Sequence, residues 1–144
     1  MPKLIFINLP VADLPRAMAF YEAVGATNEP RFTDETAACM VFSDIIHVML
    51  LTHDKFIHFS PKPIASRDTA EVMIAMSADD RAEVDRVVDK AGSSGGKADA
   101  CAKQDYGWMY NRSFEDPDGH IWENAFMDMS ACPKANIRRT DRPF

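Results

Sequence analysis

The chain has 144 residues, of which 47% are hydrophobic, and it carries a formal net charge of −6. This length fits one domain that can bury a core without disulfide bonds. No apolar run approaches the roughly 18 residues of a membrane span, and an acidic surface repels phosphate backbones. We therefore expect no membrane and no nucleic acid partner. Three scattered cysteines and the lack of a cleavable signal pattern favour a cytoplasmic protein with free thiols.

The first half of the sequence predicts one strand, one helix and then three strands. Residues 4–11 are rich in branched and aromatic side chains, which is typical of a strand. Asp13 can cap a helix that has Pro15 in its first turn and that ends at Gly25. Three short apolar segments follow, near 29–34, 37–43 and 45–52. The last of them is predicted to be a central strand that is buried on both faces.

A polar connection separates the two halves. Residues 53–68 contain two prolines, two histidines and mixed charges, which predicts a linker or a loop with a short helical turn. We expect the segment from Thr52 to Asp68 to form a lid that is more mobile than the sheet.

The second half repeats the pattern of the first at an offset of about 66 residues, which places Ser77-Ala78-Asp79 on Val11-Ala12-Asp13. Its predicted elements are a strand over 72–76, a helix capped by Asp79 or Asp80 and ended by Gly92, strands near 98–104, 107–114 and 120–127, and a turn at 116–119. We predict a single α+β domain over 1–144. It consists of two βαβββ modules, at about 1–60 and 70–128, and a C-terminal tail over 129–144 with a small basic cluster. The modules form a cupped mixed sheet with helices on its outer face.

Three segments carry a resemblance to a known family. In residues 8–25 a strand ends in Val-Ala-Asp and the next helix carries Phe-Tyr before a glycine. Residues 48–51 form an apolar strand, and residues 112–123 contain a closing Asp-Pro-Asp-Gly turn and a final strand. Over roughly 3–128 the chain resembles the vicinal-oxygen-chelate superfamily of glyoxalases, bleomycin resistance proteins and extradiol dioxygenases. It looks most like the group described as predicted lactoylglutathione lyases.

The resemblance implies paired modules, often in a homodimer, and a cup that in many members holds zinc, nickel, manganese or iron. Two histidines and two carboxylates from the first, fourth, fifth and eighth strands hold the ion, which polarises vicinal oxygens of the substrate. Only Glu123 matches this set, because Asn8, Met49 and Met73 stand near the other positions. A hard divalent ion needs about three or more nitrogen or oxygen ligands. We therefore expect an incomplete metal site, although a shifted site built from Glu123, Glu71, His47 and Asn8 stays open.

The candidate site residues each have a structural alternative. Glu123 is the candidate catalytic base and metal ligand, or else a lone carboxylate at the mouth of the cup. The candidate ligand-binding residues are Asn8, His47, Met49, Met73, Trp108 and Tyr110. His47 is otherwise expected to be a buried, hydrogen-bonded histidine. Trp108 and Tyr110 either grip a planar or anionic ligand beside Arg112, or pack under a helix with Arg112 in a salt bridge.

The other histidines are not candidate site residues. His120 is expected to begin a strand, and His53 and His58 are expected to be solvated.

The preferred function is the binding of a small, partly apolar molecule in the cup, since methionines adapt readily to varied ligands. The first alternative is a metal-dependent lyase or isomerase of the lactoylglutathione-lyase type that uses Glu123. The second alternative is a resistance protein that sequesters a cationic drug on its acidic surface.

Overall fold

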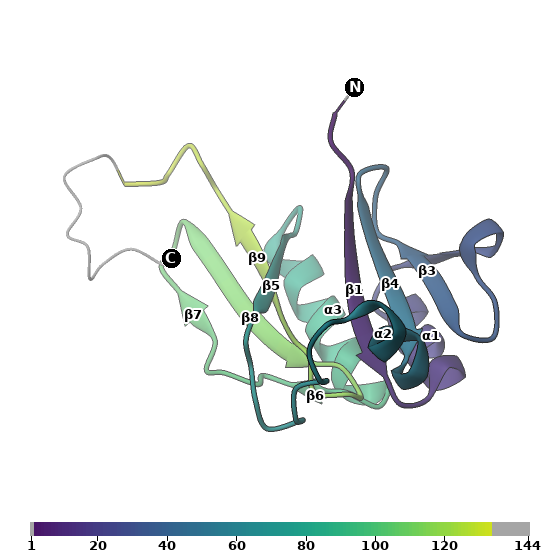
Figure 1. The fold of residues 1–144 in the computed structure, drawn as a ribbon. Helices are drawn as coiled ribbons and strands as arrows, with labels where there is room; N and C mark the ends of the chain where they lie inside the picture. The colour runs from purple at the N-terminus through teal and green to yellow at the C-terminus, as the bar shows by residue number, and fades with distance from the viewer. Residues whose placement is uncertain (1, 134–144) are drawn as a thin grey trace.

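The computed structural model describes residues 2–133, which form two sheets with helices packed against them (Figure 1). The first half contains β1 (Ile5–Val11), α1 (Leu14–Ala23), β2 (Thr27–Glu29), the 3₁₀ helix η1 (Pro30–Phe32), β3 (Ala37–Val41), β4 (Ile46–Thr52) and α2 (His53–Phe59). Its sheet has the order β1-β4-β3-β2, in which β1 and β4 are parallel.

The second half contains β5 (Met73–Ser77), α3 (Arg81–Ser93), β6 (Lys97–Ala98), β7 (Gln104–Asp105), β8 (Met109–Glu115) and β9 (Ile121–Met127). Its sheet has the order β5-β9-β8-β6, with β5 parallel to β9, and β7 also pairs with β8. The two sheets therefore repeat one arrangement, with the first strand of each half parallel to the last. The prediction of an α+β fold built from two βαβββ modules is confirmed.

Aspartate side chains cap the first turns of α1 and α3, as the sequence predicts. Asp13 caps α1 by accepting a hydrogen bond from the Arg16 amide at 3.0 Å, and Asp80 caps α3 in the same way. Gly92 does not end α3, which continues to Ser93. A Cβ at position 92 would lie 2.9 Å from the Cβ of Ala98, so this glycine allows β6 to approach the helix.

The segment after β4 adopts the second predicted alternative, a short helix followed by a loop. The Thr52 hydroxyl accepts a hydrogen bond from the Lys55 amide at 3.3 Å and caps this helix, α2. One connection differs from the sequence prediction, because the strand predicted near 98–104 is divided into β6 and β7. It breaks at Asp99, which has a φ of 53° and directs its carboxylate to Arg112.

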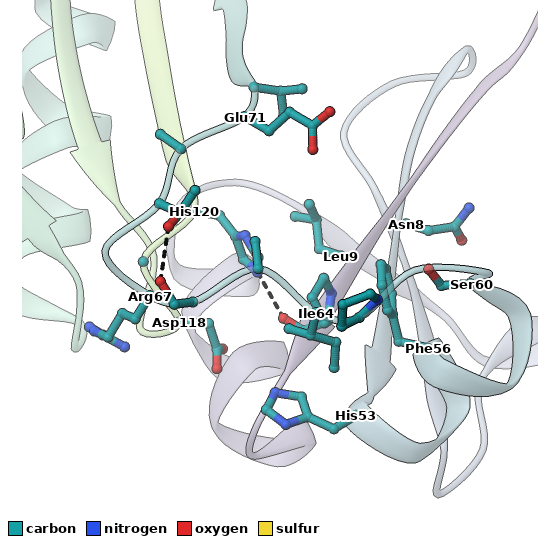
Figure 2. A pocket seen from close by; sticks show the side chains of 18 of the residues that line it. Asn8, Leu9, His53, Phe56, Ser60, Ile64, Arg67, Glu71, Asp118 and His120 are labelled. Atoms are coloured by element: carbon teal, nitrogen blue, oxygen red, sulfur yellow. Dashed lines mark hydrogen bonds between the residues drawn. The ribbon is translucent and has the colours of Figure 1, made fainter.

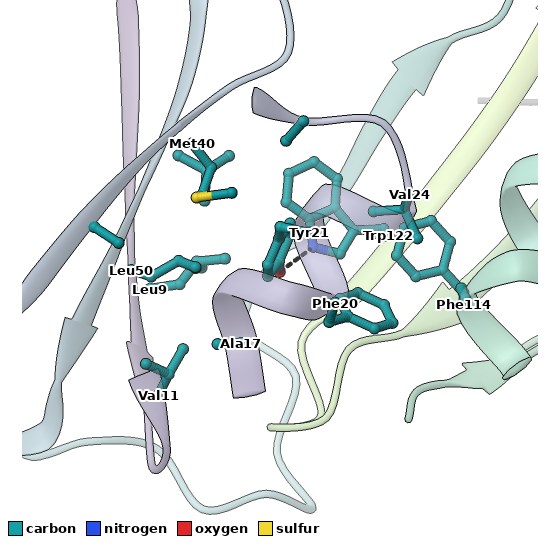
Figure 3. Close-up of a cluster of buried hydrophobic side chains, with 14 of the residues drawn as sticks. Leu9, Val11, Ala17, Phe20, Tyr21, Val24, Met40, Leu50, Phe114 and Trp122 are labelled. Atoms are coloured by element: carbon teal, nitrogen blue, oxygen red, sulfur yellow. Dashed lines mark hydrogen bonds between the residues drawn. The ribbon is translucent and has the colours of Figure 1, made fainter. Parts of the chain in front are cut away.

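One aromatic core joins the two halves (Figure 3). Phe20 and Tyr21 of α1 pack against Phe114 of β8 and Trp122 of β9, with a ring centroid distance of 6.0 Å between Tyr21 and Trp122. All four side chains are fully buried, so α1 holds the two sheets together through apolar burial.

Strand β4 is central, as predicted, but only one of its faces is fully buried. Val48 and Leu50 point into the core, whereas His47 and Met49 on the opposite face are half-buried. The prediction that both faces are buried was wrong, because no element of the described chain fully covers the face opposite α1.

Within residues 2–133, no helix is both long enough and apolar enough to cross a bilayer. The part of the predicted tail from residue 134 onward, with its arginines, lies outside the described residues.

Candidate functional site

Each sheet has an open face, which we define as the face opposite α1 or α3. Strand alternation and the pairing register place Phe6 and Asn8 of β1 on the open face of the first sheet, beside His47 and Met49 of β4. The Phe6 and His47 rings stack with a centroid distance of 4.4 Å. Nδ1 of His47 is buried and has no hydrogen-bond partner among the described residues, so the predicted hydrogen-bonded histidine is wrong at this nitrogen.

The open face of the second sheet carries Glu123 and Met73. Glu123 pairs with Ala75 of β5 on one side and with Ser113 of β8 on the other, and it is half-buried. Met73 is exposed at the start of β5. The predicted residues on β1, β4, β5 and β9 therefore lie on open faces, but they are divided between the two sheets.

Trp108 and Tyr110 lie elsewhere. The Tyr110 hydroxyl donates to Asp85 Oδ1 of α3 at 2.7 Å, and the guanidinium of Arg81 lies 4.3 Å from the ring centroid. Arg112 is bound by carboxylates of α3 and of the segment after β6. Tyr110 and Arg112 thus adopt the second predicted arrangement, packed under the helix. Trp108 precedes β8 and is half-buried.

A pocket of about 530 Å³ lies between β1, α2, the linker over residues 60–72 and the turn that precedes β9 (Figure 2). The side chains that matter below are Asn8, Phe56, Ile64, Glu71, Asp118 and His120. Of the candidate ligand-binding residues, only Asn8 lines this pocket, together with Glu71 of the predicted shifted metal site. His53, which was expected to be solvated, is exposed and also lines it.

Two side chains of the closing turn tie the pocket wall to β1. Nε2 of His120 donates to the Pro10 carbonyl oxygen at 2.8 Å, and the Ala12 amide donates to Asp118 Oδ1 at 2.8 Å. From the sequence, residues 116–119 are predicted only as a turn and His120 only as the start of a strand. The two acidic residues of Asp-Pro-Asp-Gly were a signal that the turn does more than reverse the chain.

A buried network holds this turn against α1. The Tyr21 hydroxyl donates to Asp116 Oδ2 at 2.6 Å and accepts a hydrogen bond from Trp122 Nε1 at 3.0 Å. Asp116 Oδ1 accepts from the backbone amides of Asp118 and His120. Burial raises the pKa of Asp116 and raises the pKa of Tyr21 well above its usual value. The fold core therefore positions the turn that forms one wall of the pocket.

The linker closes over the turn at Gly119. Arg67 Nη1 donates to the Pro117 carbonyl, and a Cβ at position 119 would lie 2.9 Å from Arg67 Cγ and 3.2 Å from the Arg67 carbonyl oxygen. Gly119 also has a φ of +89°, which disfavours any other residue. The linker can lie against this turn only because position 119 has no side chain.

We expect Gly119→Ala to lower the free energy of unfolding by about 2 kcal/mol, from backbone strain and the contact with Arg67. Gly107→Ala is the matched control, because Gly107 has a φ of +81° but open space around its Cβ position. Urea unfolding of both variants separates the two contributions. Equal losses would show that the linker contact at Gly119 contributes nothing.

The donor groups present within one chain do not fit a divalent ion. Within residues 2–133, no three histidine, cysteine, aspartate or glutamate side chains gather closely enough to hold one. Glu123 faces Ala75 and Ser113 across the ladder, and His47 belongs to the other sheet. The shifted site with Glu71 is therefore not assembled by these residues.

The repeated modules and the shared aromatic core define a paired βαβββ fold, with a pocket between its two halves. The sequence model of the Glyoxalase/Bleomycin resistance protein/Dioxygenase superfamily matches residues 3–124. The chain belongs to this superfamily. No curated protein sequence matches it.

Solved structures share the fold. A hypothetical protein, SA1046 from S. aureus, is 26% identical with a TM-score of 0.72, over 88% of this chain and 95% of its own. The fosfomycin resistance protein FosX from Mesorhizobium loti is 20% identical with a TM-score of 0.64, over 90% and 96% of the two chains. A bleomycin resistance determinant encoded on the transposon Tn5 is 18% identical with a TM-score of 0.61, over 89% and 100%.

Proposed function

We propose that this chain binds a small, partly apolar molecule in the pocket between its two modules, without the full metal site of the superfamily. The observation that carries the proposal is the pocket itself. Its volume of about 530 Å³ is within the range of small-molecule sites, and Phe56, Ile64 and Ile121 give it an apolar lining with a few polar groups.

The predicted residues of the open faces extend this site. Asn8 belongs both to the open face of the first sheet and to the pocket, so it is the proposed contact between the two. His47, Met49 and Met73 are the proposed contacts for an apolar part of the ligand that extends over the sheets. Methionine side chains suit such a role because they adapt to varied shapes.

We further propose a cytoplasmic homodimer. Large apolar side chains are exposed where β1 and β5 begin, and they are Leu4, Ile5, Phe6, Val72 and Met73. Surface of this kind is typical of an interface. Light scattering on the purified protein is expected to give twice the mass of 16.1 kDa, and a monomer at all concentrations would contradict the dimer.

Nuclear magnetic resonance tests the binding proposal with benzyl alcohol, a small neutral probe. We expect its addition to shift the amide signals of Asn8, Phe56 and Ile64, and Ile64→Ala to weaken binding several-fold through lost apolar contact. Ile57→Ala, in an exposed residue of α2 outside the pocket lining, is the control. No shift at the pocket would contradict the proposal. Stoichiometric zinc, nickel, manganese or iron in protein purified without chelators would contradict its metal-free part.

A second candidate is a lyase or isomerase of the lactoylglutathione-lyase type. It is favoured by the half-buried carboxylate of Glu123 on the last strand, which could abstract a proton next to a carbonyl. The hemithioacetal of methylglyoxal and glutathione is the substrate to assay, and Glu123→Gln should abolish any turnover.

Sequestration of a cationic drug is a third candidate, favoured by the net charge of −6, and titration with bleomycin tests it.

A further inference from the structure

One polar atom at the pocket has no partner in the chain. Asp118 Oδ2 is buried and makes no hydrogen bond with any described residue, whereas Oδ1 of the same carboxylate accepts from the Ala12 amide. The Asp118 side chain is only 9% exposed and is among those that line the pocket (Figure 2). A buried acceptor without a donor is unfavourable, so this oxygen is a site where a donor would gain a strong interaction.

The basic side chains nearby leave this acceptor free. Arg16 Nη2 approaches Asp118 Oδ1 at 3.8 Å, which is too far for a hydrogen bond, and its side chain is half-exposed. Arg67 is bound to the Pro117 carbonyl, and Lys62 is exposed on the linker. None of these cations forms a hydrogen bond with Asp118 Oδ2.

We propose that the ligand of this pocket is a small organic amine, whose protonated nitrogen donates to Asp118 Oδ2 while its apolar part lies against Phe56 and Ile64. The proposal rests on the function proposed above and adds the chemical class of the ligand. A carboxylate favours an ammonium donor over a hydroxyl, because the ammonium adds the Coulomb attraction between opposite charges to the hydrogen bond, and a buried oxygen is poorly screened by water. Since Oδ2 is buried in the free chain, side chains around it shift to admit the nitrogen.

Three probes of similar shape and different charge test the proposal, and they are benzylamine, benzyl alcohol and benzoate. Titrations followed by the amide signals of Asn8, Phe56 and Ile64 should show benzylamine binding about tenfold more tightly than benzyl alcohol. Benzoate should not bind, because its carboxylate would face that of Asp118. Equal affinities for benzylamine and benzyl alcohol would overturn the amine preference and leave the proposed function standing. No binding of any probe would overturn both.

Two variants locate the preference at Asp118. Asp118→Asn keeps an oxygen acceptor for the Ala12 amide but removes the charge, so benzylamine and benzyl alcohol should bind this variant with equal affinity. Arg16→Met removes the nearest cation and should strengthen benzylamine binding several-fold. A preference that survives Asp118→Asn would overturn the proposal.

A crystal structure with benzylamine gives a readout that does not depend on the variants. The expected result is the amine nitrogen within hydrogen-bond distance of Asp118 Oδ2. An ordered water at that oxygen, with the amine bound elsewhere, would overturn the proposal.

Discussion

Replacing Tyr21 by phenylalanine is expected to lower the free energy of unfolding by about 3 kcal/mol. The side chain is 0% exposed, and its hydroxyl links Asp116 Oδ2 to Trp122 Nε1. Without that hydroxyl, a buried acceptor and a buried donor both lose a partner, at about 1–3 kcal/mol each. Urea unfolding followed by tryptophan fluorescence measures the change.

Tyr106→Phe is the matched control for this prediction. Tyr106 is 43% exposed, so water can replace any partner of its hydroxyl and we expect a change within about 0.5 kcal/mol. If Tyr21→Phe is as stable as this control, the buried network does not stabilise the closing turn.

The same hydrogen-bond network is expected to make the free energy of unfolding decrease at alkaline pH. The pKa of Tyr21 is raised above its ordinary value of 10.0 by burial and then by the charge of Asp116. Its contribution to stability is therefore fully present below about pH 10 and is lost as the pH rises toward the folded-state pKa. We expect the urea midpoint of the wild type to fall more steeply above pH 10 than that of Tyr21→Phe. Parallel curves would contradict this.

The second large effect is expected for Arg112→Met, again a loss of about 3 kcal/mol. The Arg112 side chain is 9% exposed and donates to Asp85 at 2.9 Å, to Asp89 at 3.0 Å and to Asp99 at 3.0 and 2.9 Å. Removal of the guanidinium leaves three carboxylates near one another. Their partial exposure keeps the loss at the lower end of the range for buried pairs.

Arg86→Met, at an exposed position of α3, is the control for Arg112→Met and should change the stability by less than about 0.5 kcal/mol. An acid titration adds a second readout. Hydrogen bonds lower the pKa of Asp85, chiefly from Tyr110 and then from Arg112, and the bond from Arg112 lowers the pKa of Asp99. These contributions are present above about pH 4 and are lost as the pH falls through the folded-state pKa values. The loss of stability on acidification should therefore be smaller in Arg112→Met than in the wild type. An equal loss in the two proteins would show that Arg112 does not stabilise the fold through Asp85 and Asp99.

Much of the fold was predictable because its signals are local. The cap at Asp13 and the alternation along 120–127 act over a few residues, and the same local signals recur in the second half at an offset of about 66 residues. The division of the strand predicted near 98–104 was not predictable in this way. It depends on the pairing of Asp99 with Arg112, which lies on another strand.

The candidate site was predictable only in part. Strand alternation placed Asn8, His47, Met49 and Glu123 on open faces, since side-chain direction in a strand follows directly from position. It could not indicate Asp118 and His120 as pocket residues. Their roles depend on contacts with Ala12 and Pro10, which are more than a hundred positions away in the sequence.

The sequence by itself determined the βαβββ order of each half and the starts of α1 and α3, because these properties follow from periodicity and capping. The tertiary structure alone decided where the pocket lies. That pocket exists because the linker packs on the glycine of the closing turn and α1 ties the turn to the core, and these contacts arise only when the two halves share one hydrophobic interior.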